Sequence, residues 1–249
     1  NYKYWAGADE MQNVLYKALP ESLRFSTEDS WRYATDAKIK EYRKTPEDAT
    51  SNQSQKIKNL VKKIILLQKP NNNSPFRFID KSQSFTVKIG FLSELFKDSN
   101  PEFVLVTRNP FAMVWLDVKK RNNSNSVTKN TKLALEHWDN SFRLALKDKE
   151  EYNCNVHVFR FEHILISPKK EMEKICEKIN LSYSNSILPK EDDHIPFGSN
   201  YDTYYKKWHP LRTNVNDRYL KSIPDKVVSI IAKKSSDLIE RFDYNVPIK

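Results

Sequence analysis

A short apolar run, Phe-Val-Leu-Val-Thr at positions 103–107, leads through one arginine into Asn109-Pro110. Such a run is typical of a strand buried on both faces of a parallel sheet. Asn and Pro are favoured at the cap and the first position of a helix. The apolar residues that follow recur on one helical face: Phe111, Val114, Trp115 and Val118. The segment therefore predicts a β–α unit with Arg108 at the carboxyl end of a buried strand.

Two more strands are expected at 76–79 and 156–161, where aromatic and β-branched residues cluster. Helical spacing of apolar residues predicts helices at 9–18, 33–43, 56–68, 85–96, 110–121, 135–146, 167–179 and 224–242, with polar loops at 50–55 and 182–216. Strands that alternate with helices imply a parallel sheet covered on both faces. We therefore expect residues 1–249 to form a single α/β domain with a three-layer α/β/α architecture.

The chain carries a net charge of +10, which favours anionic partners such as nucleotides, nucleic acids, membrane surfaces or acidic glycans. The lysines are scattered among acidic residues and form no like-charged tail, so we expect no dedicated nucleic-acid arm. A lysine-rich solvated surface explains the same charge equally well.

The two cysteines, Cys154 and Cys176, are too few for a zinc site or a disulfide scaffold, and Cys176 falls on an apolar helical face. No run of the length of a membrane span and no signal peptide is visible. These features favour the cytoplasm without establishing it, because the chain begins at Asn1 and reads as a fragment that could follow a targeting or anchoring segment.

Glycine is unusually rare. The chain has 3 glycines, Gly7, Gly90 and Gly198, where average usage would give roughly 17. They lie far apart, so these residues contain no glycine-rich phosphate loop. A nucleotide site must use other groups or be completed by residues upstream.

Arg108 is the clearest candidate for such a site. Open α/β sheets bind ligands at the carboxyl ends of their strands. A helix start there offers unpaired N–H groups, and an arginine adds a bidentate cation that suits a phosphate group. The alternative is a surface arginine at an ordinary strand–helix corner.

The sequence Val-Thr-Arg-Asn-Pro at 106–110, followed by Ala-Met-Val, resembles the second cofactor motif of the PAPS-dependent sulfotransferase superfamily. The resemblance implies that Arg108 holds the 3′-phosphate of PAPS (3′-phosphoadenosine 5′-phosphosulfate). The family also tends to have a serine where this chain has Leu116, which removes one expected phosphate contact.

Three further segments resemble the same family, in the family's order, between Phe76 and Tyr244. Phe-Ile-Asp-Lys-Ser at 78–82 resembles its Glu-Lys-Ser/Thr element, which implies that Lys81 lies near the reacting sulfate. His-Val-Phe-Arg-Phe-Glu-His-Ile-Leu at 157–165 resembles a stretch in which Glu162 would be structural rather than catalytic.

The segments 194–200 and 209–212 resemble the late loop that closes over the nucleotide. This match implies nucleotide contacts from Gly198, Asn200 and Arg212. The family's first strand and its Pro-Arg-Ser-Gly-Thr-Thr loop, which cradles the 5′-phosphosulfate, have no counterpart here. We therefore expect them upstream, and expect weak or no activity from the chain as it stands.

The resemblance implies a P-loop NTPase-like sulfotransferase that moves a sulfuryl group from PAPS to a hydroxyl or amine of a glycan or small molecule, with no metal. Relatives take the acceptor proton with a Glu or His, and the candidates here are Asp9, Glu10 and Glu28. We expect His137 and His157 to be packed or surface residues.

Two other functions stay open at this point. A nucleotide phosphotransferase of similar layout would need a Walker lysine and magnesium-binding carboxylates, and no such arrangement is visible. A non-catalytic binding protein for nucleic acid or an anionic glycan fits the positive charge and the missing loop. A Gly-Thr/Ser-rich loop upstream would favour the enzyme.

Overall fold

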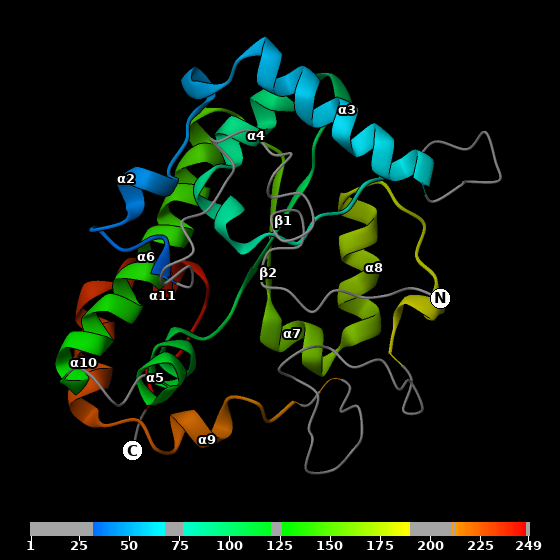
Figure 1. The fold of residues 1–249 in the computed structure, drawn as a ribbon. Coiled ribbons are helices and arrows are strands. Elements are labelled where there is room, and N and C mark those ends of the chain that lie inside the picture. Colours follow the sequence, from blue (N-terminus) through cyan, green and yellow to red (C-terminus); the bar gives the residue numbers. More distant parts are fainter. Residues whose placement is uncertain (1–31, 68–76, 121–125, 190–210, 212, 248–249) are drawn as a thin grey trace.

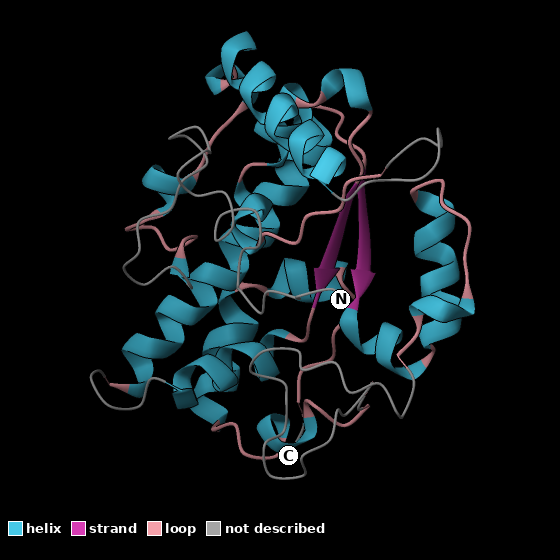
Figure 2. Ribbon diagram, turned by 45° about the vertical axis from the view of Figure 1, so that its right-hand side comes forward, coloured by secondary structure: helices cyan, strands magenta, loops and turns pink. Residues whose placement is uncertain are grey.

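The structure, a computed structural model, describes residues 32–67, 77–120, 126–189, 211 and 213–247 (Figure 1). Its centre is a two-stranded parallel sheet of β1 (Phe103–Thr107) and β2 (Val156–Arg160). The register pairs Phe103 with Val156 and Thr107 with Arg160, so both strands end at the same edge. Figure 2 shows helices on both sides of this pair. The α/β class predicted from the sequence is confirmed.

The predicted β–α unit is present. Helix α5 (Pro110–Lys120) begins directly after β1. The side-chain oxygen of Asn109 accepts hydrogen bonds from the amides of Phe111 at 3.0 Å and Ala112 at 3.2 Å. This is an N-cap, and it fixes where the helix begins.

The long helix α6 (Val127–Glu151) runs beside α5 and contributes most of the core. Its inward face carries the predicted stripe, buried throughout: Leu135, Trp138, Phe142 and Leu146. These side chains pack with β1, β2, α5, α10 (Asp225–Lys234) and α11 (Ser236–Arg241) in one continuous cluster. The cluster supports one face of the sheet.

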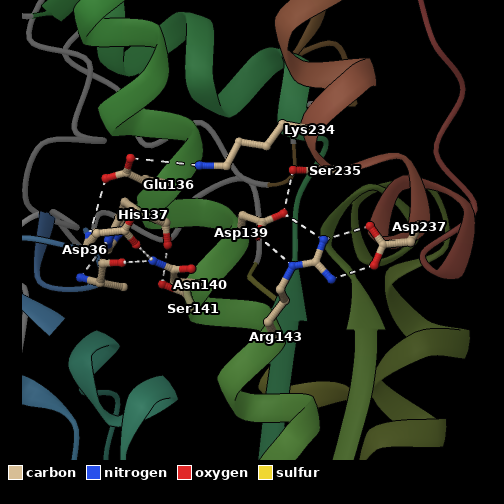
Figure 3. Close-up of polar contacts among 11 residues, drawn as sticks. Asp36, Glu136, His137, Asp139, Asn140, Ser141, Arg143, Lys234, Ser235 and Asp237 are labelled. Atoms are coloured by element: carbon tan, nitrogen blue, oxygen red, sulfur yellow. Dashed lines mark hydrogen bonds and ion pairs between the residues drawn. The ribbon is translucent and has the colours of Figure 1, made fainter. Parts of the chain in front are cut away.

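Helices α10 and α11 replace the single helix predicted over 224–242, and the break falls at Ser235. The buried Ser235 hydroxyl donates to Asp139 on α6 at 2.5 Å (Figure 3). Arg143 links α6 and α11 through the same aspartate. Its Nε donates to Asp139 at 2.6 Å, and its Nη1 donates to Asp237 of α11 at 2.5 Å. Periodicity could not predict the break because these polar contacts join distant segments.

A second group of helices packs around α3 (Ser51–Leu67) and α4 (Ile89–Leu95), which lie towards the amino-terminal end of the strands (Figure 1). It includes the 3-10 helices η3 (Pro46–Asp48), η4 (Gln83–Val87) and η5 (Lys97–Ser99). The predicted loop at 50–55 is wrong. Thr50 and Gln53 form reciprocal side chain–backbone hydrogen bonds of 2.9 and 3.2 Å, so α3 begins at Ser51. The helix predicted at 85–96 is divided at Lys88 into η4 and α4.

A buried ion pair joins these helices to α6. Arg43 forms a bidentate contact with Asp148, whose side chain is fully buried, and also donates to the carbonyl of Val87 at 3.0 Å. The amide of Gly90, at the start of α4, donates to the same carboxylate at 2.9 Å. Asp148 therefore satisfies both a guanidinium and a backbone donor.

The predicted strand at 76–79 is wrong for its described part, since residues 77–80 have no regular structure. Ile79 is 75% exposed. No described strand pairs with residues 77–80, so their backbone forms no sheet hydrogen bonds with the described sheet. The expectation that both faces of β1 are covered also fails: Val104 and Val106 are about 40% exposed.

The remaining elements follow β2. They are α7 (Phe161–Ile166), α8 (Pro168–Lys178), η6 (Asn185–Ile187) and α9 (Asp217–Leu220). Near the amino-terminal end, α2 (Ile39–Tyr42) is shorter than the predicted helix at 33–43, and the helix predicted at 9–18 lies outside the described residues. Cys154 and Cys176 are buried free thiols. Among the helices of the described part, none is long and apolar enough to cross a membrane.

Candidate functional site

The carboxyl ends of β1 and β2 bring two charged residues together. Arg108 follows β1 directly, and Glu162 lies in the first turn of α7, which follows β2. The residue after Arg108 contacts this glutamate: the amide of Asn109 donates to Oε1 of Glu162 at 2.9 Å. In Figure 1 the starts of α5 and α7, together with α9, surround this end of the strands. The parallel pairing thus brings Arg108 and Glu162 to the same edge of the sheet.

Arg108 is half-buried and held from several sides. Its Nε donates to Oδ1 of Asn216 at 2.8 Å, and its guanidinium carbon lies 5.2 Å from the centre of the Phe161 ring. Its carbonyl accepts from the indole N–H of Trp138 at 3.2 Å. Among the described residues, none accepts a hydrogen bond from its two terminal nitrogens. The edge of the guanidinium that can bind an anion in a bidentate manner is therefore uncommitted there.

Glu162 is the common acceptor of the site. Besides the Asn109 amide, it accepts from Nδ2 of Asn216 at 2.6 Å and from the Tyr244 hydroxyl at 3.1 Å. These three donors come from the end of β1, the start of α9 and the segment after α11. A carboxylate so occupied orients its neighbours, as expected for a structural residue.

Burial and charge act on both ionisable partners of this network. Burial lowers the pKa of Arg108, the negative charge of Glu162 opposes this, and the positive charge of Arg218 adds to the lowering. Arginine stays charged regardless, so the site keeps a desolvated cation. Burial, with a further contribution from Glu162, raises the pKa of Tyr244, so its hydroxyl remains a donor at neutral pH.

Arg218 is a candidate site residue that the sequence analysis did not identify. It lies on α9, is exposed, donates to the Tyr219 hydroxyl and has its guanidinium 4.6 Å from the centre of that ring. Its charge lies close enough to perturb Arg108. Two like charges repel unless an anion lies between or beside them, so the pair favours an anionic ligand. No signal in the linear sequence relates α9 to β1.

A cavity of about 1430 Å³ lies along the exposed side of β1, and its lining includes two of the predicted site residues, Arg108 and Lys81. Lys81 is exposed and comes from the irregular segment before η4. Between them the lining is mostly apolar and includes Val104, Val106 and Leu116, the last at the place where the family would have a serine. The structure thus places Lys81 and Arg108 around one space.

The other predicted residues divide into two groups. Gly198, Asn200, Arg212, Asp9, Glu10 and Glu28 lie outside the described residues. The two histidines make structural contacts: Nδ1 of His137 accepts from the amide of Ala34 at 3.2 Å, and Nε2 of His157 lies 2.8 Å from Glu102. In the described ranges, no group of three His, Cys, Asp or Glu residues could hold a metal ion.

The fold is similar to that of a solved "Sulfotransferase Domain from the Curacin Biosynthetic Pathway", with a TM-score of 0.52. The similarity covers 81% of this chain and 77% of that one at 14% sequence identity, so it concerns the fold alone. A search of curated protein sequences finds no match.

The sequence also matches a model of the Sulfotransferase family over residues 8–185. This range begins well before residue 76, where the recognised motifs start, and it includes the segments of Lys81, Arg108 and Glu162. A match over more than half of the chain establishes the relationship that the motifs suggested. The chain belongs to the sulfotransferase family.

Proposed function

We propose that this protein transfers the sulfuryl group of PAPS to a hydroxyl or amine of a glycan or small-molecule acceptor, and that Arg108 binds the 3′-phosphate. The observation that carries the proposal is the hydrogen bonding of the Arg108 guanidinium. Its Nε is held by Asn216, while no described residue accepts from its terminal nitrogens. A planar fork held in this way suits the oxygens of a phosphate group.

The local charge supports an anionic ligand of high charge density. Arg218 adds a second cation near Arg108. The carboxylate of Glu162, whose negative charge acts on Arg108, already accepts hydrogen bonds from three other donors. The start of α5 lies beside them, although the Asn109 side chain already accepts from its first free amides. The two guanidinium groups rather than the helix terminus are therefore assigned to the phosphate.

Lys81 is assigned to the transferring group. In sulfuryl transfer the acceptor oxygen or nitrogen forms a bond to sulfur while the bond from sulfur to the 5′-phosphate oxygen breaks. The electron pair of that bond leaves with 3′-phosphoadenosine 5′-phosphate (PAP), and the acceptor proton goes to a base. A cation at the bridging oxygen stabilises the charge that develops there. Lys81 lines the same cavity as Arg108, which supports this role.

The cavity is larger than the 300–1,000 Å³ typical of small-molecule sites, about 1430 Å³, so it has room for a nucleotide together with an acceptor. Gly198, Asn200 and Arg212 remain proposed nucleotide contacts on the family resemblance alone. The base is not assigned.

Calorimetry with PAP and with adenosine 5′-phosphosulfate, which lacks the 3′-phosphate, tests the proposal. A charge-assisted bidentate contact contributes about 1.5–3 kcal/mol, so Arg108→Ala is expected to weaken PAP binding by roughly ten- to a hundred-fold. Binding of adenosine 5′-phosphosulfate should change little. Arg108→Lys should recover part of the loss, because lysine lacks the planar fork.

Arg241→Ala is a matched control. It removes one arginine charge on α11, where Arg241 pairs with Glu150 at 2.7 Å. It should leave both affinities near those of the unchanged protein. If Arg108→Ala lowers the affinities for PAP and for adenosine 5′-phosphosulfate equally, Arg108 supports the fold and does not bind the 3′-phosphate. Binding of ATP with magnesium in preference to PAP would favour a phosphotransferase instead.

A further inference from the structure

Asn216 lies between the two opposite charges of the site. Its Oδ1 accepts from Nε of Arg108 at 2.8 Å, and its Nδ2 donates to Oε1 of Glu162 at 2.6 Å. The residue is buried, 6% exposed. One amide thus contacts the arginine with its acceptor and the glutamate with its donor, and no direct ion pair forms between Arg108 and Glu162 within the described part.

This arrangement is unusual for a half-buried arginine beside a glutamate at adjacent strand ends. A guanidinium and a carboxylate so placed ordinarily form a bidentate ion pair. Such a pair would occupy the same terminal nitrogens that a phosphate needs. Asn216 occupies Nε of Arg108 and one oxygen of Glu162, so it lies where such a pair would form.

The backbone of Asn216 directs its side chain into the site. Asn216 lies at the N-cap position of α9, but its φ of −89° and ψ of −23° are helical, unlike those of a residue that caps a helix with its side chain. Its side chain makes no cap hydrogen bond, and both of its polar ends contact Arg108 and Glu162 instead.

We infer that Asn216 is a positioning residue that holds Arg108 by Nε, keeps Glu162 from pairing with its terminal nitrogens, and so leaves those nitrogens for the 3′-phosphate. The inference rests on the proposed function. Glu162 still offsets the charge of Arg108 at short range, and its other donors, the Asn109 amide and the Tyr244 hydroxyl, hold it in place.

The test is a double-mutant cycle read by PAP binding. Asn216→Leu keeps the branched shape and the number of heavy atoms of the side chain and removes both hydrogen bonds, so Arg108 can turn to Glu162 and form the ion pair. PAP affinity is expected to fall about tenfold, with a much smaller change for adenosine 5′-phosphosulfate. Adding Glu162→Gln to Asn216→Leu should restore most of the PAP affinity, since a neutral amide cannot hold the guanidinium as a carboxylate does.

Tyr244→Phe is the matched control. It also removes a hydrogen bond from Glu162 but touches no atom of Arg108, so its loss of PAP affinity should be clearly smaller than that of Asn216→Leu. Should Asn216→Leu fail to fold, Asn216→Ala with and without Glu162→Gln gives the same comparison. Melting temperatures identify variants that lose affinity only by unfolding.

The outcomes separate the two claims. If Arg108→Ala discriminates between PAP and adenosine 5′-phosphosulfate while Asn216→Leu binds both normally, the role of Asn216 is overturned and the proposed function stands. If Asn216→Leu loses affinity and Glu162→Gln does not restore it, Asn216 acts on the fold and the inference is wrong. If Arg108→Ala does not discriminate, both claims fail.

Discussion

The Tyr244 hydroxyl donates to Oε2 of Glu162 at 3.1 Å and lies 3.4 Å from the hydroxyl of Thr107, the last residue of β1. The guanidinium of Arg160, the last residue of β2, covers the Tyr244 ring at 4.4 Å. The segment after α11 therefore supports the ends of both strands. Tyr244 thus packs together with Glu162 of the candidate site and with the last residues of both strands.

Tyr244→Phe should lower the free energy of unfolding by about 1.5–3 kcal/mol at neutral pH, the contribution of one hydrogen bond to a charged group. Burial raises the pKa of Tyr244 in the folded state above its ordinary value near 10. The stability from this hydroxyl is therefore present below about pH 10 and is lost as the pH rises further. Urea denaturation of both proteins between pH 8 and 11 measures it, and the gap between them should narrow at the alkaline end. A constant gap would contradict the expectation.

The β–α unit at Arg108 was predictable because local rules decide it. Asn109 caps and Pro110 begins the helix through contacts within three residues. The helix at Thr50 follows the same rules, and its capping box was present in the sequence but overlooked. In contrast, residues 77–79 include side chains that favour strands but form no strand. A strand also needs a neighbouring strand to pair with, and side-chain propensity does not determine whether one is present.

The arrangement of the candidate site was predictable only in part, for the same reason. Arg108 was identified because a strand end and a helix start flank it. Asn216 was not identified, because it lies 108 residues further along the chain, at the N-cap position of a short helix. Ser235 likewise interrupts a helical pattern through Asp139, a partner 96 residues away. Contacts of this range depend on the assembled core, which periodicity does not describe.

Asp148→Ala should be strongly destabilising, by about 3–5 kcal/mol, because it leaves the largely buried Arg43 without its partner and the Gly90 amide without an acceptor. The matched control is Asp98→Ala, which removes the exposed ion pair with Lys58 at 2.8 Å and should cost less than about 1 kcal/mol. Chemical denaturation measures both. Similar losses in the two variants would mean that burial adds nothing to the Arg43–Asp148 pair.

Gly90→Ala tests the close approach at the start of α4. A β-carbon there would lie 2.7 Å from Cδ2 of Tyr152 and 3.1 Å from Cδ of Pro46. Alanine favours the helix by up to about 1 kcal/mol, whereas overpacking costs about 1–3 kcal/mol, so a net loss of stability is expected. Tyr152→Ala in the same chain should remove the steric part, making the double variant less destabilised than the sum of the two. Additive losses, measured by thermal unfolding, would show that the ring is not the obstacle.

Arg218→Gln tests whether the second cation contributes through its charge. Arg218 is exposed, so its attraction for an anion beside Arg108 is screened by solvent and by salt. We expect PAP affinity to fall only about two- to fivefold in a low-salt buffer, and the loss to shrink towards nothing near 0.5 M salt. Arg108→Ala should lose a similar amount of PAP affinity at every salt concentration, because salt screens a partly buried contact much less than an exposed one. Lys221→Gln, which removes an exposed charge just after α9, is the control and should change affinity less at every salt concentration. A loss for Arg218→Gln that is independent of salt would mean that its contact with the Tyr219 ring, and not its charge, supports the site.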